Sequence, residues 1–257
     1  MVEIKQQAKA SYKMNSAEKL SGIVFITVTR DHTLYRRLFK TIDSKSCQTF
    51  DNTHSNAPIP KRYNEFLDGY DYSKPSWFVF CHEDFEFQES IEPLLQELPA
   101  DALYGPIGCA RKGIFPFRHQ AFLGQLTEQN RDGTGKPWQV GQPVPVLTPV
   151  ETFDCCCLIV HSTLIEEHHL RFDEELAFDL YVEDFCAMAK VKHGIQSRIL
   201  PFKATHHSGS KPTERLYRHL PYLATKYPDR DFCASCTYFG TPDLTTKALR
   251  RIISAFR

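Results

Sequence analysis

The chain has 257 residues, of which 42% are hydrophobic and 24% charged, so it is long enough to bury a sizeable core in one large domain or two small ones. Its 31 basic and 31 acidic residues cancel, and no basic surplus indicates nucleic acid as a partner. No run approaches the roughly 18 consecutive apolar residues of a membrane-spanning helix. Three consecutive cysteines, Cys155 to Cys157, lie in an apolar run, which is typical of buried thiols in a reducing cytoplasm.

The first half of the chain alternates between β-rich apolar runs and segments with helical spacing, as in an α/β domain. Residues 1–20 are polar and lack an apolar signal-peptide core, so we expect a partly disordered lead-in. We predict strands over residues 22–29, 47–50, 77–81 and 102–109, and helices after Asp31, over 59–70 and over 89–98.

The second half begins with a stretch of different character. Residues 111–149 are rich in glycine and proline, which predicts an irregular, loop-rich insertion. Beyond it we predict a strand over 154–161, a helix over 179–192 and a last strand over 197–204.

Polar side chains follow the apolar runs, where an open parallel sheet binds its ligands. We expect three groups to meet along one edge: Asp51 with Asn52; His82, Glu83 and Asp84; and His206 with His207. Carboxylates and imidazoles at strand ends can hold a divalent ion that is shared with substrate phosphates. The alternatives are a solvated turn for the acidic group and structural histidines for the pair.

An acid interrupts an apolar helical stripe in the second half of the chain. Asp184 lies at helical spacing with Leu180, Ala187 and Val191, so it faces the interior or a pocket, where its pKa can be tuned for proton transfer. A buried structural ion pair is the alternative, and the neighbouring Glu183 lies on an adjoining face.

Several nucleotide and hydrolase signatures are missing. The sequence has no P-loop, no GxGxxG after the first strand and no GxSxG. Any nucleotide phosphates must therefore be neutralised by a cation and basic side chains.

Taken in order, the segments of residues 23–209 resemble a family-2-like group of bacterial GT-A glycosyltransferases. The resemblance is carried by FDNTHSNAPIPKRYNEFLDG (50–69), FVFCHEDFEF (78–87), YGPIGCA (104–110), VETFDCCCLIV (150–160), FDEELAFDLYVEDFCAMAKVKHG (172–194) and HHSG (206–209). It implies an α/β GT-A fold, Rossmann-like, with a mixed, mainly parallel sheet flanked by helices. It also implies a single domain over 21–240, with a nucleotide-sugar-binding half (21–110) and an acceptor-side half (111–240).

The resemblance also implies roles for single residues. Asp51 and Asn52 would contact the base or ribose, and Asn64 would support the nucleotide side. His82 and Glu83 would stand beside the cofactor, and Asp84 would bind Mn²⁺ or Mg²⁺ together with His207 or His206. Asp184 would be the general base. This set of residues implies metal-dependent sugar transfer from a nucleotide-sugar donor to a saccharide or lipid-linked saccharide, with inversion favoured.

Two other functions remain open from the sequence. A sugar-phosphate nucleotidyltransferase would need a glycine-rich basic loop after the first strand, where this chain has Thr29, Arg30 and Asp31. A non-catalytic carbohydrate-binding protein would carry the same acids as structural groups.

The C-terminal segment, 241–257, has the pattern of a basic amphipathic helix. Thr241 and Pro242 suit its start, and the apolar residues recur at helical spacing beside lysine and arginine. Such a helix can lie on an anionic membrane surface, so we expect either a peripheral contact with the inner membrane face or packing on the protein's own core.

Overall fold

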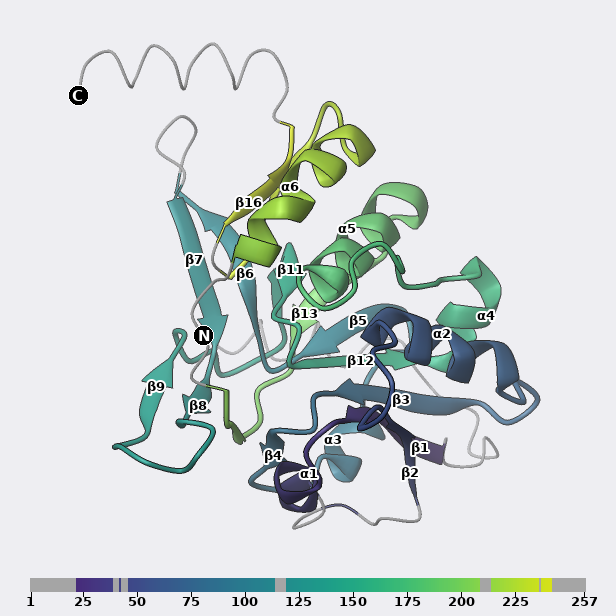
Figure 1. The fold of residues 1–257 in the computed structure, drawn as a ribbon. Coiled ribbons are helices and arrows are strands. Elements are labelled where there is room, and N and C mark those ends of the chain that lie inside the picture. The colour runs from purple at the N-terminus through teal and green to yellow at the C-terminus, as the bar shows by residue number, and fades with distance from the viewer. Residues whose placement is uncertain are drawn as a thin grey trace, which may run out of the picture.

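A seven-stranded sheet runs through the centre of the molecule, with helices against both faces (Figure 1). The computed structural model describes residues 22–38, 42, 46–113, 119–208, 214–235 and 237–241. The predicted N-terminal lead-in and nearly all of the predicted C-terminal helix lie outside these residues. The strands of the central sheet are β1 (Gly22–Thr29), β2 (Cys47–Asp51), β3 (Ser76–Cys81), β5 (Ala102–Gly105), β10 (Thr148–Val150), β12 (Cys157–His161) and β13 (Gln196–Ile199).

The strand order is β10-β13-β5-β12-β3-β1-β2. Strands β1, β2 and β3 pair in parallel, as do β5 and β13, and β12 lies antiparallel between β3 and β5. Five of the seven strands therefore run in one direction, with β12 and β10 opposed. This arrangement confirms the predicted α/β class with a mixed, mainly parallel sheet and flanking helices.

Strand β3 shows how the sequence fills both sides of the sheet. Every residue of β3 is buried, as expected for a central strand that is covered on both faces. Because successive side chains point to opposite faces, Phe78 and Phe80 join one hydrophobic cluster while Trp77, Val79 and Cys81 join the other. Each large side chain buried in this way stabilises the fold by about 1.5–3 kcal/mol.

Different helices cover the two faces. The helices are α1 (His32–Leu38), α2 (Ile59–Gly69), α3 (Glu92–Leu95), α4 (Ser162–His168), α5 (Tyr181–His193) and α6 (Glu214–Lys226). Apolar side chains of α2, α4, α5 and α6 belong to the cluster of Phe78 and Phe80, and those of α1 and α3 belong to the other. Helix α5 begins after Leu180, which adopts a left-handed backbone with φ 65°, and ends at Gly194, whose φ of 73° closes the helix.

The structure also contains three smaller sheets. Their strands are β4 (Phe85–Phe87), β14 (Ala204–His206), β8 (Leu126–Glu128) and β9 (Trp138–Val140) in a four-stranded sheet; β11 (Thr152–Phe153), β6 (Ile107–Lys112) and β7 (His119–Gly124) in a second; and β15 (Asp231–Cys233) with β16 (Tyr238–Gly240) in a hairpin.

The prediction of irregular, loop-rich structure over 111–149 was right only in part. That stretch contributes the end of β6, all of β7, β8 and β9 and the start of β10, which are short strands between glycine turns. Residues 129–137 and 141–147 between them lie outside any strand or helix. The predicted strands over 102–109 and 197–204 are each divided into two strands, which belong to different sheets. None of the helices in the described part has the length and apolar character needed to cross a bilayer.

A close backbone crossing at Gly124 gives a test of the fold. Gly124 has φ 93°, and a Cβ there would lie 2.0 Å from the carbonyl oxygen of Pro106. We expect Gly124→Ala to lower the free energy of unfolding by about 1–3 kcal/mol or more, because the added Cβ clashes with the backbone at a residue whose φ is already unfavourable for alanine. Urea denaturation measures the loss. The control is Gly69→Ala, because nothing lies within 4 Å of a Cβ at that helical position; an equal loss there would contradict the explanation.

Candidate functional site

Three side chains converge at the carboxyl edge of the central sheet. His82, Asp84 and His206 place one ligand atom each within 4.8 Å of the others, and all three come from the junction of β3, β4 and β14. Strand β3 ends at Cys81, and a turn closed by the bond from the Phe85 amide to the His82 carbonyl leads into β4. Because β14 pairs antiparallel with β4, His206 lies opposite Phe85 and beside this turn. The pairing of distant strands thus brings the three side chains together.

Partners behind the two imidazoles fix which nitrogen faces the cluster. The Tyr181 hydroxyl donates to the Cys155 carbonyl over 3.1 Å, so at its 2.9 Å contact with His82 it accepts from Nε2–H. This leaves the lone pair of His82 on Nδ1, 3.9 Å from Asp84 Oδ1. In the same way, the Glu128 carboxylate lies 3.1 Å from Nδ1 of His206, which directs Nε2 toward Asp84. Outer partners of this kind orient metal-ligating histidines in proteins.

Two of the converging atoms lack hydrogen bonds. Asp84 Oδ1 and His206 Nε2 are buried 3.3 Å apart, and neither has a hydrogen-bond partner among the described residues. Buried polar atoms without partners are costly, and a cation between them would satisfy both. Two imidazoles and a carboxylate are ligands for a borderline divalent ion such as Mn²⁺. The donor set therefore fits a divalent metal ion.

The electrostatics of the cluster favour a positive charge beside Asp84. Burial alone would raise the pKa of Asp84, but the neighbouring His206 and His82 outweigh burial and lower it. Burial opposes a charged His206, yet Asp84 and Glu128 outweigh burial and raise the pKa of His206 to about 10. His82 differs, because burial dominates and lowers its pKa. A proton on His206 or a metal ion can supply the charge that Asp84 requires.

The cluster opens into a cavity of about 460 Å³. His82 and Asp84 line it together with three arginines: Arg30, Arg131 and Arg215. The Arg215 guanidinium lies 4.3 Å above the ring of Phe178 and donates a hydrogen bond to Asp179. These two contacts hold the positive charge beside the cavity. Several fixed guanidinium groups next to a metal-binding cluster suit a ligand with two or more negative charges, such as a diphosphate.

Glu83, predicted at the cofactor, binds the protein itself. Its Oε2 accepts hydrogen bonds from the Thr29 hydroxyl and from the backbone amides of Arg30 and Asp31, and its Oε1 accepts from Arg131. The carboxylate thereby joins the end of β1 to the turn after β3. It also fixes Arg30 and Arg131, which line the cavity.

The predicted nucleotide residues lie around the same edge but do not all face it. Asp51 is exposed and accepts two bonds from Thr53. The Asn52 amide is buried and donates to the Ala57 carbonyl over 2.9 Å, which shapes a loop that lines the cavity. Asn64 exchanges two 2.9 Å bonds with the backbone of Phe172 and so ties α2 to the segment that leads to Phe178.

The sequence left open which of two adjacent histidines binds metal. His206 belongs to the cluster, whereas the ring of His207 lies 2.8 Å from Glu86 and is not one of the three converging residues.

Asp184, predicted to be the general base, is buried against α6. Its Oδ2 lies 2.8 Å from Lys226 Nζ, and its Oδ1 accepts a 2.8 Å bond from the Tyr227 hydroxyl. Burial raises the pKa of Asp184, with Lys226 opposing the rise. The buried ion pair that the sequence allowed at this position is therefore present.

Its neighbour Glu183 has different surroundings. Glu183 Oε2 accepts a 2.9 Å bond from the Cys155 thiol, and the carbonyl of the same cysteine accepts from Tyr181, the partner of His82. Burial, followed by repulsion from Asp154, raises the pKa of Glu183 to about 8. Glu183 is thus a buried acid whose pKa lies near neutral pH, and Cys155 and Tyr181 separate it from His82.

Sequence reasoning missed the supporting residues. Arg30 directly follows the first strand and could have been found by inspecting strand ends. Glu128 and Arg131 lie in the stretch taken for loop. Nothing in the spacing of Tyr181 distinguishes it from a core aromatic residue.

Comparison with known proteins gives a remote likeness only. No protein-family model matches the sequence, and no curated protein matches it. Among solved structures, residues 1–349 of TarS from S. aureus match with 12% identity and a TM-score of 0.47, over 80% of this chain and 65% of that chain. The same TarS fragment in complex with UDP gives a TM-score of 0.44, and A197 from STIV gives 0.39 with 13% identity over 72% of this chain and 85% of that chain. This chain therefore spans 65% of the length of the TarS fragment.

The hydroxyl of Tyr181 gives a test of the cluster. Tyr181→Phe removes the acceptor that holds the proton on His82 Nε2, so we expect the affinity for Mn²⁺ to fall by about 10- to 100-fold. Isothermal titration calorimetry measures the affinity. Tyr222→Phe is the control, because that hydroxyl binds Asp173 on the exposed surface. Equal Mn²⁺ affinities of the Tyr181 variant and the wild-type protein would contradict the assignment.

The raised pKa of Glu183 predicts how stability depends on pH. Between its ordinary pKa of 4.5 and about 8, the folded protein holds a proton that the unfolded chain releases, so stability falls as the pH rises through this window. Glu183→Gln removes this dependence. We expect the Tm of the variant to gain on that of the wild-type protein steadily from pH 5 to pH 8.5. The exposed Glu97→Gln should show no such trend; a flat difference for Glu183→Gln would show that the group is not buried as described.

Proposed function

We propose that the protein is a metal-dependent glycosyltransferase that moves a sugar from a nucleotide-sugar donor to an acceptor hydroxyl. The observation that carries the proposal is the convergence of His82, Asp84 and His206 beside a cavity lined by three arginines, at the carboxyl edge of an α/β sheet. Ligands of such sheets bind at this edge. The combination suits a donor in which a sugar is joined to a diphosphate.

The donor set favours Mn²⁺ over Mg²⁺. Mg²⁺ prefers oxygen ligands and keeps several waters, whereas imidazole nitrogen suits transition metals better. A metal ion held by His82, Asp84 and His206 would neutralise the charge of the diphosphate leaving group. Its remaining positions would be free for phosphate oxygens and water.

The arginines supply the second half of the phosphate site. Arg30 is bonded to Asn56 and Arg131 to Glu83, so both guanidinium groups are positioned before a ligand enters. Arg215 lines the same cavity, with its guanidinium over the ring of Phe178. Positioned cations of this kind stabilise developing negative charge without reorganising. Asn52 and Asn64 support the nucleotide side indirectly, by holding the loops that line the cavity, and Asp51 stays a predicted contact of the base or ribose.

The reaction that we propose is a single displacement with inversion. The acceptor oxygen forms a bond to the anomeric carbon while the bond from that carbon to the diphosphate oxygen breaks, and a nucleoside diphosphate leaves. A carboxylate takes the proton of the acceptor hydroxyl. Asp184, the candidate from the sequence, is engaged through both oxygens by Lys226 and Tyr227, and its neighbour Glu183 is a second candidate, which would act as a base only in its ionised form, above its pKa of about 8.

The acceptor is a saccharide or a lipid-linked saccharide. A lipid-linked acceptor would bring the enzyme to the inner membrane face, and the helix predicted over 241–257 would make that contact. The two other functions considered from sequence would each give a distinct result with nucleotide substrates: nucleotidyl transfer would release pyrophosphate, and non-catalytic sugar binding would raise Tm without turnover.

The metal site is tested with Asp84→Asn. Screening UDP- and GDP-sugars by thermal shift should find a donor that raises Tm only with Mn²⁺, and release of nucleoside diphosphate should follow. In Asp84→Asn the Mn²⁺-dependent shift should vanish and turnover should fall at least about 100-fold. Asp71→Asn is the control, since Asp71 is exposed and paired with Lys74. Normal turnover in the Asp84 variant would contradict the assignment of Asp84 as a metal ligand. Pyrophosphate release from a nucleoside triphosphate would identify a nucleotidyltransferase.

The base is identified by comparing two isosteric variants. If Glu183 is the base, Glu183→Gln lowers kcat by about 10²–10⁴-fold and leaves donor binding unchanged. Asp184→Asn should instead lower Tm, because it leaves the ammonium of Lys226 with one buried partner fewer. A loss of kcat in Asp184→Asn at unchanged Tm, with Glu183→Gln fully active, would return the role to Asp184.

A further inference from the structure

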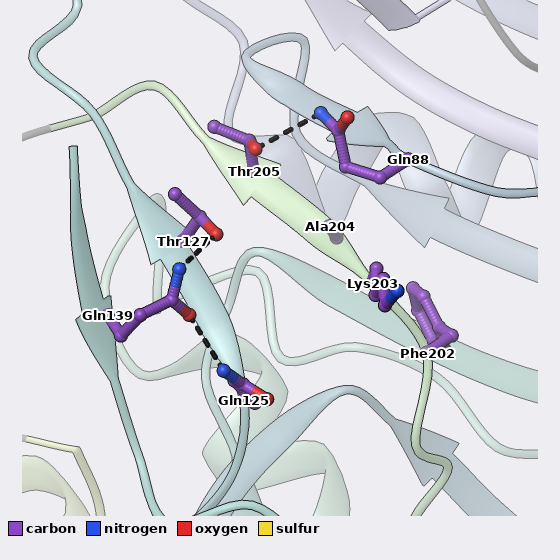
Figure 2. A pocket seen from close by; sticks show the side chains of 8 residues that line it. All are labelled: Gln88, Gln125, Thr127, Gln139, Phe202, Lys203, Ala204 and Thr205. Carbon is purple, nitrogen blue, oxygen red and sulfur yellow. Dashed lines mark hydrogen bonds between the residues drawn. The ribbon is translucent and has the colours of Figure 1, made fainter.

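A second cavity, of about 360 Å³, lies on the face of the four-stranded sheet that points away from the metal-binding cluster. Figure 2 shows the polar side chains that line it: Gln88, Gln125, Thr127, Gln139, Lys203 and Thr205. Its volume falls in the range of about 300–1,000 Å³ that is usual for small-molecule sites. The proposed transfer reaction uses none of these residues.

The alternation of side chains along β14 and β8 separates the two sites. In β14, His206 turns toward the metal-binding cluster, so its neighbour Thr205 points to the opposite face. In β8, Glu128 binds His206 while Thr127 lines the cavity. Since Thr205 pairs with Thr127 and His206 with Glu128, the same strands present hydroxyls on one face and the metal-binding groups on the other.

Hydrogen bonds hold the amides of the cavity in place. Gln139 donates to the Thr127 hydroxyl over 2.7 Å, and Gln125 donates to the Gln139 carbonyl over 3.0 Å. On the neighbouring strand, Gln88 donates to Thr205 over 3.1 Å, and Figure 2 shows these as two separate bonded groups. A glutamine amide carries two hydrogens and an oxygen with two lone pairs, so each still has donors or acceptors for a ligand.

The charge of the lining excludes other ligand classes. Among the described residues that line the cavity, Lys203 is the one ionisable group and none is a carboxylate. A divalent cation would need carboxylates, and a diphosphate would need several cations. Phe202 and Ala204 also line the cavity but are almost fully buried, so the accessible lining is mainly polar. A sugar hydroxyl both donates and accepts a hydrogen bond, which matches paired amides and hydroxyls.

We propose that this cavity binds a neutral saccharide, independently of the site that we assign to the nucleotide-sugar donor. The occupant is one or two units of a neutral sugar chain, held by the amides of Gln88, Gln125 and Gln139 and the hydroxyls of Thr127 and Thr205. The cavity retains a glycan chain on the protein while the metal-side cavity is empty or filled.

Binding of the full chain to an array of neutral oligosaccharides, built of hexoses and N-acetylhexosamines, tests the proposal. The retained oligosaccharide is then titrated by saturation-transfer NMR without metal or nucleotide. We expect Gln139→Ala and Thr205→Val each to weaken its affinity by about 3- to 10-fold, the effect of one lost neutral hydrogen bond. The control is Gln196→Ala, which alters an exposed glutamine of the central sheet. Unchanged Tm in each variant shows that the sheet is intact.

Three outcomes would overturn the proposal: no retained oligosaccharide, equal affinity in the wild-type protein and both cavity variants, or competition by Mn²⁺ with a nucleoside diphosphate. The last would put the sugar at the metal side. Because the measurement needs neither donor nor turnover, its failure leaves the proposed transfer reaction unaffected. Conversely, a loss of transferase activity in Asp84→Asn with intact oligosaccharide binding would support two separate sites.

Discussion

The edge of the sheet depends on burying one carboxylate, that of Glu83. Its oxygens take four hydrogen bonds, from Thr29, Arg30, Asp31 and Arg131. A buried charge without such partners is costly, and breaking a buried pair by removing one partner typically costs about 3–5 kcal/mol. Because the donors come from β1, the turn after it and the segment after β8, the carboxylate holds three chain segments in register. The turn that carries His82 and Asp84 is thereby fixed relative to Arg30 and Arg131, which line the cavity with it.

The central strands and their polar ends could be predicted because local pattern determines them. A continuous apolar run, such as Trp77 to Cys81, predicts a central strand that is buried on both faces. The residues after it then lie at the edge of the sheet. Pattern cannot reveal which distant segments pair. The pairing of β14 with β4 and β8 brings His206 to Asp84, and because neighbouring side chains of a strand point to opposite faces, His207 is not part of the cluster.

The supporting residues were missed for a related reason. Tyr181 and Glu128 act by orienting the imidazoles of His82 and His206. A buried hydroxyl or carboxylate that hydrogen-bonds to a metal-ligating side chain produces no periodic pattern in the sequence. The glycine-rich stretch of 111–149 misled for the opposite reason, because glycines that permit close strand crossings look like loop residues until the crossings are seen. At Asp184, the helical spacing predicted burial, but its partners are Lys226 at the end of α6 and Tyr227 directly after it, and that helix was not predicted from the sequence.

The backbone of Leu180 has a consequence for how this protein can be engineered. Leu180 is fully buried at the left-handed position before α5, a conformation that is unfavourable for a branched apolar residue. Glycine at this position would remove the backbone strain but would leave a cavity in the core. It would also loosen the start of α5, where Tyr181 contacts His82. The local gain and the lost alignment are therefore in conflict at this residue. Because the lost packing of a buried leucine, about 2–5 kcal/mol, exceeds the strain of about 1–2 kcal/mol that glycine would relieve, a stability-guided redesign would keep the strained leucine at the start of α5 and with it the position of Tyr181.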